Sequence, residues 1–307
     1  MGPTGSGKTA LISRLPGEFF EAVSIDSRQV YRHMPISVAS PTTQEQTRVR
    51  HHLLDCLEPD QAIDAAWFVR QARASIDDIL KRGKLPILVG GSGFYLKALR
   101  SGMPDALPVD AALRLEIQSM SHEERLAELM RLRPGLVCTN SARLAAGGGV
   151  FHPNDQYRVQ RHLELARARI KHSRPMQKAD SDRSWTPIRI EGWWIDMPRP
   201  DYWAGLEARI EAMLQAGLQT EVMSVYQRFG DCHALSALGC LDIVLQSRTG
   251  RISRAELARR LFVLHRQYGK RQRTWFRKET CLQAIEARQF DDSVQGFLNK
   301  RYPAWTV

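Results

Sequence analysis

The sequence predicts an α/β fold, in which a parallel sheet is flanked by helices and an all-helical lobe is inserted into the chain. Up to about residue 108, short apolar runs alternate with segments of helical periodicity, as in doubly wound α/β proteins. Residues 109–184 show helical patterns alone, and a strand-like segment returns after residue 185. We therefore expect a core formed by residues 1–108 and 185–307, with an inserted helical domain at 109–184.

The first core segment contains two predicted strands separated by helices. A helix is expected from residue 8 to about 15, and residues 21–26 then form a short strand that ends in an acid. Residues 65–81 place apolar side chains at helical spacing before a Gly-Lys pair. The apolar run 85–89 is typical of a buried parallel strand, and another helix is expected at 94–99.

Later segments follow the same logic. Residues 185–195 are strand-like, and we expect them to rejoin the sheet. Helices are predicted at 111–119, 123–132 and 155–171 in the insertion, and at 203–217, 221–229 and 254–270 after it.

Composition indicates a globular intracellular enzyme, which we expect to be cytoplasmic and monomeric. Of the 307 residues, 43% are hydrophobic and 25% are charged, which is ordinary for a protein with a buried core. The sequence has no apolar run long enough to span a membrane and no signal-peptide pattern, so no membrane partner is expected. The five cysteines are scattered and form no CxxC pair, so neither a disulfide framework nor a zinc site is indicated.

Net charge is the unusual property of this composition. A formal charge of +11 exceeds what a phosphate ligand needs, and it suggests a polyanion larger than a nucleotide. The charge is concentrated: residues 259–278 hold eight Lys or Arg and no acid, and residues 158–174 hold six and one acid. Two such tracts favour nucleic-acid contact, although each alone could be a solvated helix face.

Residues 2–9 have the spacing of a phosphate-binding loop, with all four required positions present. In such loops the backbone amides face the phosphates, the lysine adds charge, the threonine hydroxyl can bind Mg²⁺, and the next helix points its positive end at the anion. A chance glycine-rich turn is the alternative. The phosphate-binding residues would be Gly2, Pro3, Thr4, Gly5, Ser6, Gly7, Lys8 and Thr9.

The loop lies close to the first residue of the sequence. A buried apolar strand usually leads into such a loop, and only Met1 precedes it here, so we expect a chain that starts late.

Asp26 ends the first predicted strand and is the leading candidate for a general base. Because the carboxyl ends of parallel strands face one crevice, this acid is expected beside the phosphate loop. A helix cap or an outer Mg²⁺ contact is the alternative. The other predicted strand ends in Gly90 and Gly91 without an acid, which argues against simple ATP hydrolysis.

The ordered set of motifs resembles the tRNA dimethylallyltransferases, also called tRNA isopentenyltransferases. A single motif is a weak signal, but the set runs in order over nearly the whole chain. The matching segments are residues 2–9, 26–32, 51–55, 88–96, 153–155 and 270–275.

The resemblance implies a P-loop NTPase-like core that binds dimethylallyl diphosphate instead of a nucleoside triphosphate. Enzymes of this family attach the dimethylallyl group to N6 of the adenosine 3′ of the tRNA anticodon, position 37. Asp26 matches the family's base, and Lys8, the loop amides and Mg²⁺ held by Thr9 would stabilise the leaving diphosphate. Ser92 stands where the family usually has threonine, and Arg209 matches an arginine near the diphosphate.

The resemblance also implies a set of residues that contact the tRNA anticodon stem-loop. They lie at the end of the first strand, at the glycine-rich turn after the second, in the insertion and in the basic C-terminal tract. They are Asp26, Ser27, Arg28, Gln29, Ser92, Arg114, Tyr157, Arg158, Val159, Gln160, Arg161, Lys270, Arg271, Gln272, Arg273, Thr274, Trp275 and Arg277.

Several positions depart from the family pattern. Tyr157 replaces a usual glutamine, residues 238–242 lack an aromatic and a cation, and residues 147–149 lie in an apparent insertion. His51 and His52 are adjacent in a predicted strand and face opposite sides, so structural or RNA-contact roles are favoured over a metal site. Two other functions stay open at this point: a phosphate-loop kinase of nucleotides or small molecules, and a catalytically weak tRNA-binding protein.

Overall fold

The computed structural model describes residues 1–102, 111–140, 144, 150–171, 187–250 and 253–302. The chain divides into two compact units: one formed by residues 1–102 with 187–307, and a second formed by residues 103–186. Three earlier expectations lie wholly or partly outside the described residues, namely the insertion at 147–149 and parts of the predicted boundaries near 108 and 184.

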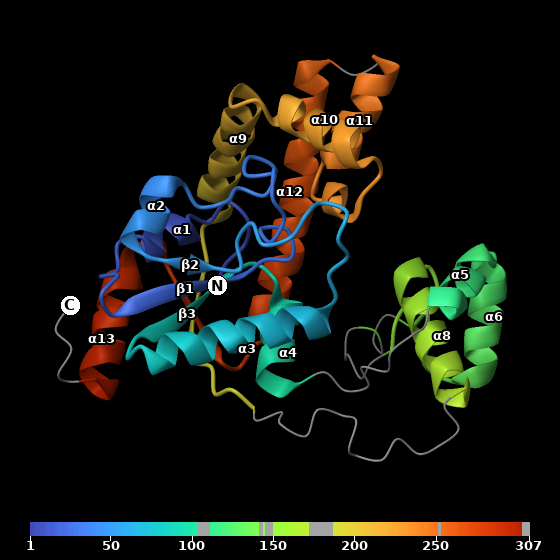
Figure 1. Cartoon of the computed structure of the whole chain (residues 1–307), viewed down its shortest axis with the longest axis horizontal. Coiled ribbons are helices and arrows are strands. Elements are labelled where there is room, and N and C mark those ends of the chain that lie inside the picture. The colour runs from blue at the N-terminus through green and yellow to red at the C-terminus, as the bar shows by residue number, and fades with distance from the viewer. Residues whose placement is uncertain (103–110, 141–143, 145–149, 172–186, 251–252, 303–307) are drawn as a thin grey trace. The chain divides into compact units, whose positions relative to one another are not determined.

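A parallel three-stranded sheet forms the centre of the first unit (Figure 1). Its strands are β1 (Phe20–Ile25), β2 (His51–His52) and β3 (Leu85–Gly90), in the order β2-β1-β3. Every residue of β1 is buried, as expected for a parallel strand between two neighbours. The register places Ile25 opposite Gly90, so the carboxyl ends of β1 and β3 lie side by side.

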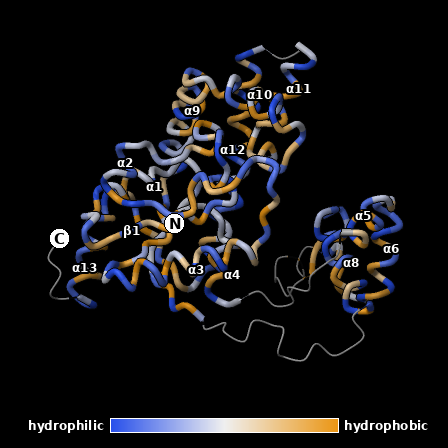
Figure 2. Tube along the Cα trace, in the orientation of Figure 1, coloured by the Kyte–Doolittle hydropathy of each residue, from blue (hydrophilic) through white to orange (hydrophobic). Residues whose placement is uncertain are grey.

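Four helices occur in residues 1–102, the first segment of this unit. They are α1 (Lys8–Ile12), α2 (Thr43–Arg48), α3 (Ala65–Lys81) and α4 (Gly93–Ser101). Asp64 caps α3 by accepting from the Trp67 N–H at 2.7 Å, and the helix buries apolar side chains spaced three or four residues apart. Figure 2 shows both hydrophobic and hydrophilic residues along α3, which fits a helix that buries one side.

The strand predicted at 185–195 is shorter than expected and pairs elsewhere. Only β4 (Gly192–Ile195) forms, and its ladder partner is the parallel strand β5 (Leu282–Ile285), in a separate two-stranded sheet. The prediction that this segment rejoins the main sheet was therefore wrong in its pairing. Met1 lies between the two sheets: its amino group donates to Trp193 O at 2.8 Å, and its carbonyl accepts from Ile195 N at 3.0 Å.

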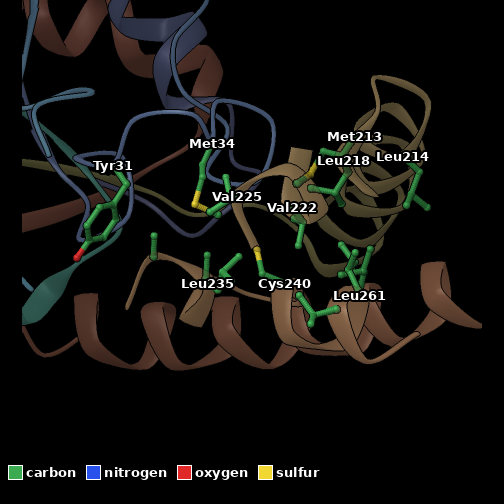
Figure 3. Packing of buried hydrophobic residues seen from close by; sticks show 14 of the residues in the cluster. Tyr31, Met34, Met213, Leu214, Leu218, Val222, Val225, Leu235, Cys240 and Leu261 are labelled. Carbon is green, nitrogen blue, oxygen red and sulfur yellow. The ribbon is translucent and has the colours of Figure 1, made fainter. Parts of the chain in front are cut away.

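The C-terminal half of the first unit is mostly helical. The elements are α9 (Arg199–Gln215), α10 (Leu218–Phe229), η1 (His233–Ser236), α11 (Cys240–Thr249), α12 (Arg254–Phe276), η2 (Ala287–Gln289) and α13 (Phe290–Arg301). Figure 3 shows the cluster in which Tyr31 and Met34 pack with residues of α9, α10, α11 and α12. This cluster fixes the segment after β1 against the helices.

Helix α12 is six residues longer than predicted, because its basic tract is also amphipathic. Leu261, His265, Gln272 and Phe276 are buried at helical spacing, while Lys270 and Arg271 remain exposed. Polar residues that are buried and hydrogen-bonded interrupt the apolar periodicity of α12. A prediction from apolar spacing alone therefore places the end of the helix too early.

The second unit packs three described helices around its own core. These are α5 (Ala111–Ser119), α6 (His122–Leu132) and α8 (Gln156–Lys171). A capping box begins α6, where Ser121 and Glu124 exchange hydrogen bonds. The core residues are Ile117, Leu129, Phe151, Val159 and Leu163. Among the described residues of either unit, no helix is long and apolar enough to cross a membrane.

Glu21 is a buried, charged residue in the central strand of the sheet. It lies in β1 with a side chain only 2% exposed, and it pairs with His52 at 2.7 Å, with Lys84 at 3.3 Å and with Arg82. His52 thus has a structural role, as does His51, whose Nδ1 hydrogen-bonds the Val49 carbonyl at 2.7 Å. Hydrogen bonding from Arg82 is the main cause that lowers the pKa of Glu21 from 4.5 to about 2.

We predict that Glu21→Gln removes an acid-sensitive part of the protein's stability. Because the pKa is depressed in the folded state, the stabilisation is present above about pH 4.5 and is lost as the pH falls toward 2. The free energy of unfolding is measured with urea for both proteins at several pH values. Between about pH 4.5 and pH 2, that of the wild-type protein should fall by about 3 kcal/mol more than that of the variant. Asp78→Asn alters an exposed partner of the same arginine, so this substitution should change the acid-sensitive stability by less than about 1 kcal/mol. Equal effects of the two substitutions would contradict the role given to Glu21.

Candidate active site

The phosphate-binding loop adopts a folded-back conformation that exposes backbone donors. Gly5 and Gly7 have φ values of 79° and 73°, a region that favours glycine, and the Ser6 N–H donates to the Pro3 carbonyl at 3.2 Å. Helix α1 has only five residues and begins at Lys8, and its N-cap residue Gly7 offers no side-chain cap. The loop amides, more than the dipole of this short helix, are therefore the groups available to an anion.

Gln272 of α12 ties the loop to the glycine-rich turn after β3. Its Oε1 accepts from the Thr4 N–H at 2.8 Å, and its Nε2 donates to the Gly91 carbonyl at 2.9 Å. The residue is only 5% exposed, and a Cβ atom at position 91 would overlap its amide, so a side chain there would displace Gln272. The Gly2 N–H also donates to the Gly90 carbonyl at 3.2 Å. Two loops that are far apart in sequence are thus held together by one side chain and one backbone bond.

Asp26 follows β1 at the same edge of the sheet. Its Oδ1 accepts from the Arg28 N–H at 2.9 Å, which orients the carboxylate. Burial raises the pKa of Asp26, while the Arg28 and Gln29 N–H groups and the charge of Lys8 oppose that rise. A carboxylate in this setting takes up a proton more readily than one in water, which is a property of a general base.

Three charged groups share the interior of this site. Burial lowers the pKa of Lys8 to about 8, the charge of Asp26 opposes the shift, and the charge of Arg209 reinforces it. Lys8 donates to the Pro3 carbonyl at 2.8 Å, which leaves further ammonium hydrogens for a ligand. Burial likewise lowers the pKa of Arg209 on α9. The site therefore concentrates positive charge where an anion would relieve it.

Unsatisfied polar atoms mark where such an anion would lie. Within the described residues, Ser6 Oγ, Arg209 Nε and Tyr202 Oη are buried without a hydrogen-bond partner. Ser6 belongs to the loop, and a Cβ atom at Gly5 would lie 3.9 Å from Arg209 Cδ, so the arginine contacts the loop. Buried donors of this kind are costly unless a ligand satisfies them.

Ser92 completes the edge of the sheet. It precedes α4, but its hydroxyl does not cap that helix and instead lies near the Tyr268 hydroxyl of α12, whose pKa it lowers. Burial raises the pKa of Tyr268 to about 12, and the nearby charge of Asp26 adds to the shift. The Ser92 N–H donates to the Ile25 carbonyl at 3.3 Å, directly before Asp26. The two candidate catalytic residues after β1 and β3 therefore share one edge with the phosphate loop.

Known proteins resemble the chain over most of its length. Residues 29–279 match the family model described as IPP transferase. A tRNA dimethylallyltransferase from Leptospira interrogans is 35% identical over 290 residues, covering 92% of this chain and 93% of that protein. The chain belongs to the IPP transferase family.

Other members of the family support the same grouping. A tRNA dimethylallyltransferase from an Anaeromyxobacter species is 38% identical over 299 residues, covering 92% of each chain. The crystal structure of a full-length tRNA isopentenylpyrophosphate transferase from Bacillus halodurans aligns with a TM-score of 0.66 and 28% identity, over 99% of this chain and 96% of that one. Family membership favours the transferase interpretation over the kinase alternative and identifies the fold as the P-loop NTPase-like type.

Several residues predicted to contact tRNA on α12 differ in exposure. Lys270, Arg271, Thr274 and Arg277 are exposed, whereas Gln272 is buried and its amide is used by the two loops; an RNA contact by Gln272 stays a prediction. Arg273 forms an ion pair with Asp196. The Trp275 indole donates to Glu279 at 2.9 Å, and a Cβ atom at Gly93 would overlap its ring, so the ring packs under α4.

Two of the side chains after β1 that are predicted to contact tRNA also bind other groups within the protein. Gln29 Oε1 accepts from the Ser24 hydroxyl at 2.7 Å, and its Nε2 donates to the Ala39 carbonyl at 3.0 Å. Arg28 donates to the His233 carbonyl at 3.1 Å. Ser27 is half-buried. The side chains of Gln29 and Arg28 therefore order the segment that carries Asp26.

In the second unit, the side chain of Val159 is fully buried in the core, and an RNA contact at this position stays a prediction. Tyr157 is 77% exposed, and Arg158 lies beside Asp155 at 3.4 Å. The other three predicted residues share one buried partner, the Glu164 carboxylate. Arg114, Gln160 and Arg161 approach it at 3.8, 3.0 and 2.9 Å.

Sequence reasoning missed Tyr268 and Tyr202, as well as the bridging role of Gln272. For Tyr268 the sequence did offer a signal, because this residue lies in the basic tract, two residues before Lys270. For Tyr202 no motif exists, because its importance comes from an unsatisfied hydroxyl packed against Gly269.

We predict that Gln272→Met loosens the phosphate loop. The Thr4 N–H and the Gly91 carbonyl would lose their partners, which should cost about 1–3 kcal/mol of unfolding free energy and weaken inorganic diphosphate binding about tenfold. Urea denaturation and isothermal titration measure the two effects. Thr274→Ala, an exposed change on the same helix, serves as the control. Normal stability and normal diphosphate affinity, together with weaker tRNA binding, would return Gln272 to the RNA contacts.

Proposed function

We propose that this chain transfers the dimethylallyl group of dimethylallyl diphosphate to N6 of the adenosine 3′ of the tRNA anticodon, position 37, and releases diphosphate. The observation that supports this proposal is that Asp26, an oriented and half-buried acid, lies at the same sheet edge as Ser92 and a phosphate loop that has unsatisfied buried donors. Family membership supports the reaction class.

The loop and α9 supply the binding groups for the diphosphate. Loop amides, the Lys8 ammonium, the Ser6 hydroxyl and the Arg209 guanidinium would donate to its oxygens. These donors gain most from the charge that develops on the leaving diphosphate, because they are already oriented in a site with little water. The lowered pKa of Lys8 and of Arg209 without a ligand would rise again once the anion is bound.

Mg²⁺ fits this donor set. Thr9 stands in the first turn of α1, where its hydroxyl would bind the ion, and substrate phosphates and water would supply most other ligands. When bound, Mg²⁺ would neutralise charge on the departing diphosphate.

Asp26 would act on the incoming amine. The N6 amine of adenosine is a weak nucleophile because its lone pair is delocalised into the ring. As the C–N bond forms and the allylic C–O bond breaks, the electron pair leaves with diphosphate and the N6 proton passes to Asp26. The Ser92 hydroxyl, which lies near Tyr268, would position the amine at the same edge.

The tRNA partner accounts for the net charge of +11. The exposed cations Lys270, Arg271 and Arg277 on α12 are suited to phosphate contacts, and the base must leave its stack to reach Asp26. A monomeric state and a cytoplasmic location are part of this proposal. Size-exclusion chromatography and cell fractionation test them.

We predict that Asp26→Asn abolishes transfer while tRNA binding remains near the wild-type level. The purified chain is incubated with Mg²⁺, dimethylallyl diphosphate and unmodified tRNA, and the nucleosides are analysed by mass spectrometry. Loss of the base should reduce the rate about 10²- to 10⁴-fold. Asp242→Asn, a change of a carboxylate on α11 that pairs with Arg260, is the control. Absence of prenylated adenosine with the wild-type chain would refute the proposed function.

The same assay over pH checks the role of Asp26. Because burial raises its pKa above 3.8, the wild-type rate should rise with pH through that raised value as the base form appears, and level off above it. A rate that falls over this range would assign the acid form of Asp26 to the reaction instead.

We predict that Arg271→Ala weakens binding of an anticodon stem-loop and lowers the slope of log affinity against log salt by about one. Arg271 is exposed, with its guanidinium 5.6 Å from the centre of the Tyr268 ring. Arg273→Ala is the matched comparison, because that arginine is already neutralised by Asp196 and should leave the slope nearly unchanged. Fluorescence anisotropy at several salt concentrations measures both, and a larger effect at Arg273 would contradict the assignment.

A further inference from the structure

Tyr202, near the start of helix α9, carries a buried hydroxyl that has no hydrogen-bond partner. The residue is only 3% exposed, and its Oη atom is among the few buried side-chain polar atoms of the described residues that are left unpaired. An unpaired buried hydroxyl is unfavourable, because it has lost its hydrogen bonds to water and gained none in return. A native protein that retains such a group has a reason for it.

Helix α12 is shaped to admit this hydroxyl. A Cβ atom at Gly269 would lie 1.9 Å from Tyr202 Oη and 2.9 Å from its Cζ atom. Gly269 stands in the interior of a 23-residue helix, where glycine is less favourable than alanine. The helix therefore gives up some stability at this position and leaves the space that the tyrosine hydroxyl fills.

Tyr202 lies on the side of α9 that packs against the phosphate loop. Leu206 and Arg209 follow it by four and seven residues, a spacing that places all three on one side of the helix. A Cβ atom at Gly5 of the loop would lie 2.7 Å from Leu206 Cδ2 and 3.9 Å from Arg209 Cδ. The hydroxyl is thus carried by the helix face that contacts the loop.

The α12 side of the hydroxyl also leads to the loop. Gly269 precedes Gln272 by three residues, so the two lie on one side of α12. Gln272 accepts from the Thr4 N–H at 2.8 Å. The Tyr202 hydroxyl is therefore enclosed by two helices, each of which contacts the phosphate loop within one or two turns of it.

The charged groups around Tyr202 are hydrogen-bond donors. Burial raises the pKa of Tyr202 to about 12, and the charges of Arg273 and Arg209 oppose the rise. Arg273 is paired with Asp196, whereas Arg209 Nε is buried without a partner. Because a guanidinium has no acceptor atom, neither arginine can take the hydroxyl proton. The group that fits beside Tyr202 and Arg209 is an acceptor, and the positive charge favours an anionic one.

A phosphate oxygen suits this position better than a water molecule. A water that accepted from both the Tyr202 hydroxyl and Arg209 would still need acceptors for its own two hydrogens. A phosphate oxygen has only lone pairs, so it accepts from both donors and leaves no hydrogen unpaired. Its charge also compensates that of the buried guanidinium.

We propose that Tyr202 is a diphosphate-binding residue, whose hydroxyl donates to an oxygen of the phosphoryl group that Arg209 binds. Tyr202 then acts in the proposed transfer reaction, on which this assignment rests. The loop amides and Lys8 hold the diphosphate on one side, and α9 holds it on the other through Arg209 and Tyr202. The unpaired hydroxyl is unfavourable only in the free protein, because the bound diphosphate supplies its partner.

The test is Tyr202→Phe, which removes the hydroxyl and keeps the ring. Because the hydroxyl is unpaired in the free protein, the midpoint of urea unfolding without ligand should be equal to that of the wild-type protein or higher. Affinity for inorganic diphosphate with Mg²⁺, measured by isothermal titration, should fall about tenfold, because a hydrogen bond to a charged group is lost. Loss of affinity without loss of stability separates a ligand contact from a structural one.

Gly269→Ala tests the same contact from α12. Its Cβ atom would displace the hydroxyl, so diphosphate affinity should again fall, and combining it with Tyr202→Phe should add little further loss. Tyr226→Phe is the control. The Tyr226 hydroxyl accepts from Arg248 at 3.5 Å, so its removal should leave diphosphate affinity unchanged.

Unchanged diphosphate affinity of Tyr202→Phe would overturn the assignment. A fall in affinity that comes with a lower unfolding midpoint would also overturn it, because the hydroxyl would then be paired in the free protein. If the wild-type chain itself fails to bind inorganic diphosphate, the phosphate site of the proposed function fails as well. The first two results leave that site intact, so the two kinds of failure are distinguishable.

Discussion

The two hydrogen bonds of Gln272 are the constraint on which the site depends. A phosphate-binding loop turns several backbone donors toward one point, and such a loop has few contacts of its own to hold that shape. Gln272 supplies an acceptor to Thr4 and a donor to Gly91 from a long helix that is buried along one side. The phosphate loop and the turn bearing Ser92 are therefore placed by the same residue, and the distance between them is set by the length of one side chain.

The second constraint is electrostatic. Lys8, Arg209 and Asp26 are all partly removed from water, and the two cations outnumber the single carboxylate. Such an arrangement is unfavourable without a ligand, since burial opposes each charge and the two cations repel. An anionic substrate would reverse both effects. The unsatisfied atoms of Ser6 and Arg209 point to the same conclusion by an independent route, because they are hydrogen-bond donors that the protein itself does not use.

The residues predicted to bind tRNA show that residue type indicates a possible contact, whereas position on a helix determines whether the side chain is exposed. The basic tract of α12 contains residues of two kinds: Arg271 remains exposed, whereas Gln272 is buried and Arg273 is neutralised by Asp196. In the second unit the alternation is similar, since Tyr157 is exposed and Val159 fills the core two residues later. Neighbours in a helix point in different directions, so a contiguous motif cannot supply a contiguous surface. A motif identifies the segment that contacts a ligand, but the helix determines which of its residues can do so.

The sequence by itself determined the α/β class, the helical insertion, the phosphate loop, the family and the place of Asp26 and Ser92 at strand ends. These features are local, since they depend on spacing, periodicity and the direction of parallel strands. Tertiary structure alone decided that β4 pairs with β5, that Gln272 bridges two loops, and that Tyr268 lies near Ser92. Each of these joins residues between about 89 and 268 positions apart, and such contacts are set by packing, which no short pattern in the sequence records.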